Sequence, residues 1–247
     1  MTDSLAAHST LPRLAPDEIV SLAREAEAWS PQEVLRWALE RFHPLIAFAS
    51  SFGVEDVAVI DMLTKIRPDA RVFTLDTGRL PAETYEVMER VRERYHLPLE
   101  VHFPERKAVE SLEKEKGFYS FRLSVEDRKN CCGIRKVVPL GRALSGLDAW
   151  ITGLRREQAV TRAGVPAIES DPAHGGILKI NPLAQWSERQ VWDYVRTFHV
   201  PYNRLHDQGY PSIGCAPCTR AIEKGEDVRA GRWWWENPES KECGLHR

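Results

Sequence analysis

The five cysteines are the residues of this 247-residue chain whose type and spacing most directly suggest chemistry. Four occur in two pairs, one adjacent and one of the Cys-x-x-Cys type, and the fifth stands alone near the C-terminus. An odd number of cysteines argues against a disulfide framework and suits a reducing compartment. We therefore expect thiols that bind a metal or react. The pairs are Cys131 with Cys132 and Cys215 with Cys218, and the lone residue is Cys243.

The two pairs together supply four thiolates, which suits either a zinc ion or an iron–sulfur cluster. Structural zinc sites usually draw on cysteines separated in the sequence, as in Cys-x-x-Cys, because one turn must aim both sulfurs at a small ion. Adjacent residues point their side chains apart, which a larger cluster accepts more easily. The spacing favours a cluster, with zinc as the alternative and buried free thiols as a third interpretation.

Cys243 lies four residues from the end of the chain, where a cysteine makes a poor core residue. Lys241, His246 and Arg247 would stabilise the thiolate, the form that attacks, whereas Glu242 opposes it. A terminal thiol is also open to oxidation. This setting favours a nucleophile on a tail that swings between a substrate and a partner, with a passenger cysteine as the alternative.

Apolar runs that alternate with helical patterns indicate the elements that position these cysteines. Such alternation predicts a mostly parallel, twisted sheet with helices on both faces, an α/β fold. We also expect a helix capped by Ser124, with the adjacent cysteine pair at its start. The expected strands are residues 45–49, 72–75, 99–103, 149–153 and 177–180, and the other expected helices are residues 17–29, 31–42, 81–95, 108–116 and 187–199, with one more after Gly53.

The pattern divides the chain into two parts. Residues 1–201 are expected to form the α/β domain, with residues 1–14 as a flexible tail. Residues 202–247 show one short helical stretch near 216–223 and are otherwise irregular, as functional or disordered segments are. This C-terminal segment carries the second cysteine pair and Cys243, so we expect it to end in a mobile catalytic tail.

Small polar residues follow the first two predicted strands. Ligands of open α/β sheets bind beyond the carboxyl ends of the strands, and free N–H groups at a helix start suit an anion. The first turn matches neither GxxxxGK[ST] nor GxGxxG, so an ordinary capped turn remains the alternative. The residues concerned are Ser50, Ser51 and Gly53 after the first strand, and Asp76, Thr77 and Gly78 after the second.

Composition narrows the class of protein. The hydrophobic fraction of 43% suits a globular protein with a full core, and the net charge of −2 argues against a general nucleic-acid or membrane-surface protein. The sequence has neither an apolar run long enough to span a membrane nor a secretory signal, so we expect a cytoplasmic protein. An anionic ligand would then be bound by local cations, for which Lys136, Arg229 and Arg232 are candidates.

Taken together, these motifs resemble the phosphoadenylyl-sulfate and adenylyl-sulfate reductase family, in its iron–sulfur branch. The resemblance runs from about Ala47 to His246 and depends on the order of motifs that are weak one by one. The motifs are Ser50-Ser51-Phe52-Gly53, residues 75–84 (LDTGRLPAET), the two cysteine pairs, Arg232-Trp233-Trp234-Trp235-Glu236 and Glu242-Cys243-Gly244-Leu245-His246.

The resemblance implies an adenine-nucleotide α-hydrolase-like fold, although residues 51–56 depart from the SGGxDS motif of the related ATP pyrophosphatases. It implies one [4Fe-4S] cluster per chain, held by Cys131, Cys132, Cys215 and Cys218, and catalysis by Cys243. The substrate-binding residues that it implies are Ser50, Ser51, Gly53, Asp76, Thr77, Gly78, Lys136, Gly153, Arg162, Arg229 and Arg232.

The reaction implied by the resemblance is thioredoxin-dependent reduction of adenylyl sulfate to sulfite and AMP, in assimilatory sulfate reduction. It passes through an S-sulfocysteine on Cys243, and thioredoxin or a glutaredoxin-like dithiol then releases sulfite. Members with four further cysteines tend to use adenylyl sulfate, and members are commonly homo-oligomers; no nucleic-acid or membrane partner is expected. The alternatives are the same reaction on 3′-phosphoadenylyl sulfate and a zinc-bearing, ATP-dependent sulfur-transfer protein.

Overall fold

A six-stranded sheet with the order β3-β2-β1-β4-β6-β5 forms the centre of the molecule. The computed structural model describes residues 14–237, 244 and 245, so Cys243 lies outside the described residues. Five strands run parallel, and β5 pairs antiparallel with β6 at one edge. The strands are β1 (Ile46–Ala49), β2 (Arg71–Leu75), β3 (Leu99–His102), β4 (Ala149–Ile151), β5 (Ile168–Asp171) and β6 (Ile177–Ile180).

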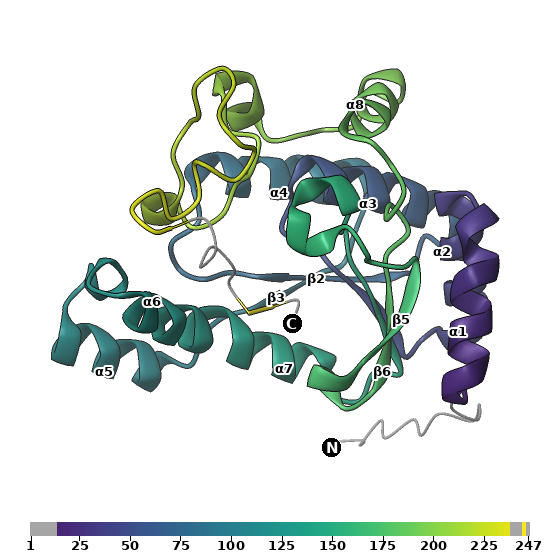
Figure 1. Cartoon of the computed structure of the whole chain (residues 1–247), viewed down its shortest axis with the longest axis horizontal. Coiled ribbons are helices and arrows are strands. Elements are labelled where there is room, and N and C mark those ends of the chain that lie inside the picture. The colour runs from purple at the N-terminus through teal and green to yellow at the C-terminus, as the bar shows by residue number, and fades with distance from the viewer. Residues whose placement is uncertain (1–13, 238–243, 246–247) are drawn as a thin grey trace.

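Helices cover both faces of the sheet, as predicted (Figure 1). On one face lie α2 (Pro31–Phe42), α3 (Val54–Ile66), α4 (Ala82–Tyr95) and α8 (Glu188–Thr197). On the other lie α5 (Arg106–Lys116), α6 (Val125–Cys132) and α7 (Val138–Leu144), while α1 (Pro16–Glu25) packs against β5. No helix in the described part of the chain is long and apolar enough to cross a membrane.

Capping explains why several helices begin where the sequence predicts. Ser30 accepts a hydrogen bond from the backbone N–H of Glu33, and the Glu33 carboxylate accepts from the Ser30 N–H, which starts α2 at Pro31. Ser187 and Gln190 form the same reciprocal pair at the start of α8. Both predicted capping boxes are confirmed.

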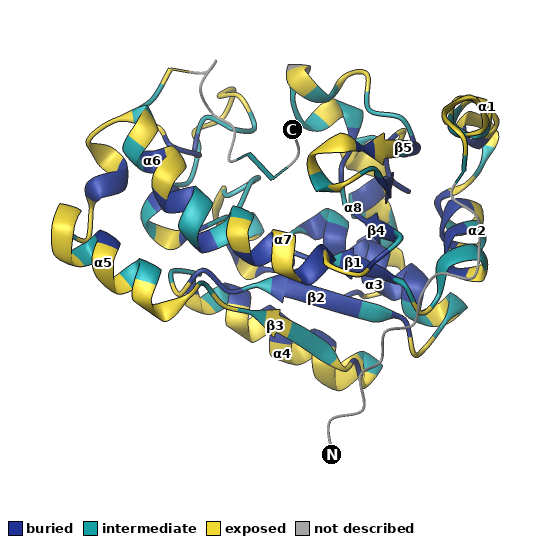
Figure 2. Cartoon of the chain, turned by 90° about the horizontal axis from the view of Figure 1, so that it is seen from below, coloured by how far each residue is buried: buried dark blue, intermediate teal, exposed yellow. Residues whose placement is uncertain are grey.

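The inner helix α3 contacts α2, α4 and α8 and is buried on most of its surface. Figure 2 shows β1, β2 and α3 largely in the buried colour, whereas α5 turns an exposed side outward. Strands enclosed between two helical layers are expected to be mostly apolar, as the first two predicted strands are.

Three sequence predictions differ from the structure. The adjacent cysteine pair ends α6 instead of starting it, although Ser124 does cap that helix. Residues 216–223 contain only a single 3₁₀ turn, Ala216–Cys218. Neither β5 nor α7 was predicted, because β5, at the sheet edge, has a single apolar residue followed by three polar ones, and α7 contains Pro139 and Gly141.

Asp61 lies within α3 and joins three helices. Its carboxylate is 1% exposed and accepts hydrogen bonds from the hydroxyls of Tyr95 in α4 (2.9 Å) and Tyr194 in α8 (2.6 Å). Lys65 Nζ also lies 2.6 Å from this carboxylate. Burial and the bonds to Asp61 raise the pKa of both tyrosines, so both remain protonated donors.

We expect Asp61→Ala to lower the free energy of unfolding by about 3 kcal/mol, because buried hydroxyls without a partner cost about 1–3 kcal/mol each. Urea unfolding followed by circular dichroism measures this loss. The control is Asp69→Ala, whose exposed carboxylate pairs with Arg67 and His43 and should contribute less than about 1 kcal/mol. Equal losses in the two variants would contradict the role of Asp61.

Candidate functional site

A cavity of about 770 Å³ lies at the carboxyl ends of β1, β2 and β4. Residues that directly follow these strands line it, at the position where open α/β sheets bind ligands. Asp76 and Gly78 do not belong to the lining. The predicted substrate-binding residues that line the cavity are Ser50, Ser51, Gly53, Thr77, Lys136, Gly153, Arg162, Arg229 and Arg232.

The turn after β1 is organised by Asp56, a residue that sequence reasoning had not proposed for the site. The N–H and hydroxyl of Ser51 donate to Asp56 Oδ2 over 2.5 and 2.7 Å. The N–H of Phe52, a residue in the left-handed region (φ 59°), donates to Ser50 Oγ over 3.1 Å. These donors stabilise the turn from within.

Burial raises the pKa of the Asp56 carboxyl to about 7, although the hydrogen bonds from Ser51 act in the opposite direction. Gly153, at the end of β4, leaves room for this carboxyl: a Cβ atom at Gly153 would lie 2.1 Å from Asp56 Oδ1. Because Gly153 has no side chain, the Asp56 carboxyl can occupy its place in the β1 turn. The departure of residues 51–56 from SGGxDS was the sequence signal that could have pointed to Asp56.

The turn after β2 connects the cavity to the cysteines. Asp76 accepts hydrogen bonds from the Gly78 N–H (2.8 Å) and the Tyr85 hydroxyl (2.9 Å), so it shapes the turn and does not face the cavity. Burial, together with the bond to Asp76, raises the pKa of Tyr85 to about 12. Thr77 lines the cavity, and its hydroxyl lies 3.3 Å from Cys215 Sγ.

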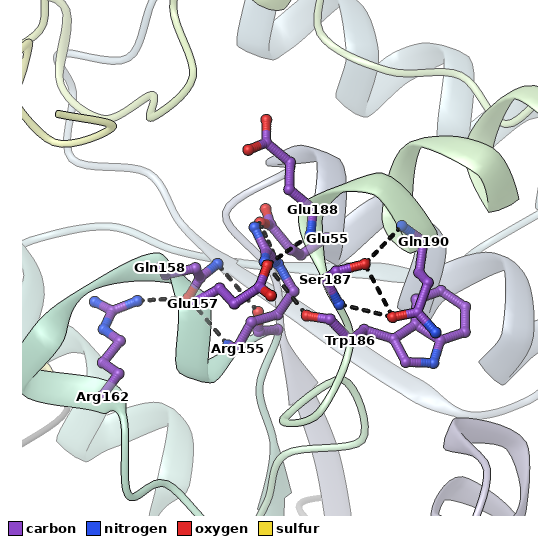
Figure 3. A network of polar contacts seen from close by, with 10 residues as sticks. Glu55, Arg155, Glu157, Gln158, Arg162, Trp186, Ser187, Glu188 and Gln190 are labelled. Atoms are coloured by element: carbon purple, nitrogen blue, oxygen red, sulfur yellow. Dashed lines mark hydrogen bonds and ion pairs between the residues drawn. The ribbon is translucent and has the colours of Figure 1, made fainter. Parts of the chain in front are cut away.

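A polar network holds Arg162 at the rim of the cavity (Figure 3). Arg162 Nη1 donates to Gln158 Oε1 over 2.7 Å, and the same oxygen accepts from the Arg155 N–H over 3.1 Å. The buried Arg155 side chain in turn donates to Glu55 Oε1 in the first turn of α3, over 2.8 and 2.9 Å. Sequence reasoning missed Gln158, Arg155 and Glu55; the pairing of Arg155 with Glu55 in particular joins segments a hundred residues apart.

The four paired cysteines come together in one apolar cluster. Cys131, Cys132, Cys215 and Cys218 are each buried, none forms a disulfide, and they pack with Trp233 and other apolar side chains. The first pair lies where α6 gives way to a π-helical turn, Gly133–Val137. Such turns often mark functional sites.

Cationic residues act on these thiols unequally. Burial raises the pKa of Cys131, and it raises that of Cys218 to about 12. Burial also disfavours the Cys215 thiolate, but Lys136, the Thr77 hydroxyl and nearby arginines outweigh it and lower the Cys215 pKa. The environment therefore already favours negative charge at one of the four sulfurs.

The residues present fit a polynuclear group better than isolated thiols. Four buried sulfurs face cationic neighbours, and the buried indole Nε1 of Trp233 has no hydrogen-bond partner among the described residues. Among the described residues, no group of three or more histidine, cysteine, aspartate or glutamate side chains is placed so that it could hold a metal ion. Iron–sulfur clusters take four cysteine thiolates.

The fold and the site define a nucleotide-binding type of α/β protein, with an anion-suited cavity beside a cluster of thiols. The phosphoadenosine phosphosulfate reductase domain family matches residues 45–221. The chain belongs to this family, and its fold is of the adenine-nucleotide α-hydrolase-like type.

Relatives of known name are similar over most of the chain. A protein of Allochromatium vinosum named adenosine 5′-phosphosulfate reductase is 57% identical over 82% of this chain and 78% of its own length. A protein of the same name from Burkholderia cepacia is 53% identical over 83% and 81%. The crystal structure of phosphoadenylyl-sulfate reductase from Candida auris, a phosphate complex, superposes with a TM-score of 0.73 at 33% identity, over 85% of this chain and 99% of that chain.

We expect Gly153→Ala to weaken AMP binding by about tenfold or more, because the new methyl group would displace Asp56 from Ser51 and break the hydrogen bonds that hold the β1 turn. Isothermal titration with AMP measures the affinity. Gly164→Ala is the matched control, since a Cβ atom there meets nothing within 4 Å. Unchanged AMP binding in Gly153→Ala would mean that the β1 turn does not depend on Asp56.

Proposed function

We propose that the chain reduces adenosine 5′-phosphosulfate to sulfite and AMP, with thioredoxin or a glutaredoxin-like dithiol as the electron donor. The observation that carries this proposal is the convergence of Lys136, Arg229 and Arg232 with the two strand-end turns around one cavity beside four thiols. Family membership and the names of the relatives supply the substrate class.

The cavity offers complementary charge to a phosphosulfate. Lys136, Arg229 and Arg232 bring cationic groups to its wall, and Arg162 adds a fourth at the rim. Preorganised cations stabilise charge that moves onto a leaving group without reorganisation at the moment of reaction. In this proposal they hold the phosphosulfate and stabilise AMP as it departs, while the turns after β1, β2 and β4 bind the nucleoside end.

Cys243 is the proposed nucleophile, and the described residues beside it are Gly244 and Leu245. Leu245 lines the cavity and packs on the apolar cluster beneath the sheet.

The proposed reaction has two steps that balance. The Cys243 thiolate attacks the sulfur of the sulfate group, the S–O bond to AMP breaks, and an S-sulfocysteine forms. A thiolate of the dithiol protein then attacks Cys243 Sγ, and sulfite leaves with the electron pair of the broken S–S bond. The second thiol of the donor resolves the mixed disulfide and restores the Cys243 thiolate, so the donor is oxidised to a disulfide.

We further propose one [4Fe-4S] cluster per chain, held by Cys131, Cys132, Cys215 and Cys218. When bound, such a cluster supplies a polarising charge and a covalent link between α6 and the C-terminal segment, without redox change. Thr77 and Lys136, which both line the cavity, lower the pKa of Cys215 and so favour its thiolate.

The remaining features of the proposal concern organisation. Residues 1–201 would serve as the nucleotide-binding domain and residues 202–247 as the segment that carries the second cysteine pair and the catalytic tail. We propose a cytoplasmic homo-oligomer. The second candidate function is the same reaction on 3′-phosphoadenylyl sulfate, which the likeness to the Candida auris enzyme favours; competition kinetics with the two nucleotides separates them.

We expect Cys243→Ser to abolish sulfite formation while iron content and nucleotide affinity stay at the wild-type level, because serine removes only the nucleophile. Sulfite assay, iron assay and titration with adenylyl sulfate measure the three properties. In the wild-type protein without a dithiol, mass spectrometry should find one added sulfite group on Cys243. Normal turnover of the serine variant would refute the mechanism.

For the metal, we expect protein purified without air to contain iron and to absorb visible light, and Cys218→Ser to lose both. Cys243→Ser is the matched control, since it should keep both signals. Zinc in place of iron, with no visible absorption, would refute the cluster and favour a zinc-bearing, ATP-dependent sulfur-transfer protein.

A further inference from the structure

Three arginines surround the indole ring of Trp233. Their guanidinium carbons lie 4.6 Å (Arg128), 4.8 Å (Arg232) and 6.0 Å (Arg229) from a ring centroid, within the range of cation–π attraction. The ring is 1% exposed, packs with the cysteine cluster and also lines the cavity. Trp233 therefore lies between the thiols and the cations that the proposed function assigns to the phosphosulfate.

Arg128 anchors this arrangement on the side away from the cavity. Its side chain is completely buried and forms a two-pronged ion pair with Glu236, over 2.8 and 2.9 Å. The Glu236 side chain is 4% exposed, so the pair is well shielded from water. Charge-assisted bidentate pairs fix geometry as well as adding energy. Arg128 belongs to α6, three residues before Cys131, so the pair ties the cysteine helix to the C-terminal segment.

Arg232 lies at the cavity. It is 7% exposed, and its Nη1 donates to Ser212 Oγ over 3.3 Å. Gly214 lets the guanidinium pass, since a Cβ atom there would lie 2.2 Å from Arg232 Nη2. The backbone N–H of Trp233 donates to the Cys218 carbonyl over 3.2 Å, so the ring is fixed to the second cysteine pair.

We infer that Glu236, Arg128 and Trp233 are positioning residues, which set the guanidinium groups of Arg229 and Arg232 toward the anionic end of the nucleotide. This inference rests on the proposed function. The negative face of an aromatic ring attracts nearby cations, so Trp233 offsets part of the repulsion between the guanidinium groups close to it. Glu236, Arg128, Trp233 and Arg232 contact one another in turn, so a movement of the cysteine helix would also move the cavity arginines.

The test measures the affinity for adenylyl sulfate and for adenosine in a Cys243→Ser background, where substrate is not consumed. We expect Trp233→Leu to weaken adenylyl sulfate binding by about tenfold and Trp233→Phe by about threefold, because cation–π attraction is strongest with tryptophan. Adenosine binding should not change, since adenosine lacks the anionic phosphosulfate that the arginines are proposed to bind. Iron content reports whether the cluster is retained.

Trp234→Leu is the matched control, because this neighbouring tryptophan is 37% exposed and stacks with Arg122 instead of a cavity arginine. Its adenylyl sulfate affinity should stay unchanged. Glu236→Gln, which keeps the shape of the side chain but removes its charge, should weaken adenylyl sulfate binding by about threefold without affecting adenosine. This milder variant decides the question if Trp233→Leu loses iron or fails to fold.

The inference is overturned if adenosine and adenylyl sulfate binding fall in parallel, or if Trp233→Leu and Trp234→Leu have equal effects. It is also overturned if Trp233→Phe and Glu236→Gln both bind adenylyl sulfate like the parent. A parent protein that does not bind adenylyl sulfate at all would instead refute the proposed function.

Discussion

Burial of positive charge between the thiols and the cavity is the constraint on which the rest of the site depends. Arg128, Arg135 and Arg232 are each no more than 7% exposed, and an unpaired buried charge is costly. Buried or half-buried carboxylates pair with two of these arginines. Glu236 pairs with Arg128, and Glu113 accepts from Arg135 over 2.5 Å and from Arg79 over 2.9 Å. These pairs fix cations at positions where thiolates and an anionic ligand can share them.

The π-helical turn between α6 and α7 serves the same constraint. In such a turn, residues five positions apart lie on one face, whereas an α-helix aligns residues three or four apart. Lys136 follows Cys131 by five residues, within the stretch where Gly133–Val137 forms the π turn. The lysine ammonium acts on the Cys131, Cys215 and Cys218 sulfurs and also lines the cavity. The local change from α-helix to π-helix thus places the Lys136 ammonium close to both the cysteine cluster and the cavity.

Local signals predicted the sheet, most helices and the place of the cavity, because caps and apolar runs act within a few residues. The Ser30 and Ser187 capping boxes begin helices as expected, and small polar residues do gather beyond β1 and β2. The remainder depends on contacts between distant segments. The Asp56 carboxyl occupies space that Gly153 leaves free, and Arg155 donates to Glu55, which lies a hundred residues away in the sequence. No periodicity in the sequence records such pairings.

The net charge of −2 and the anion-suited cavity are compatible because charge is organised locally. Glu236 pairs with Arg128 outside the cavity lining, Glu55 pairs with Arg155 within it, and Lys136 and Arg232 also line the cavity. The same two cations lower the pKa of Cys215, so a thiolate cluster and a phosphosulfate draw on shared charge. Under the proposed function, a cluster on these thiols and a phosphosulfate in the cavity would be electrostatically coupled, so a cluster without redox change would still influence how the nucleotide binds.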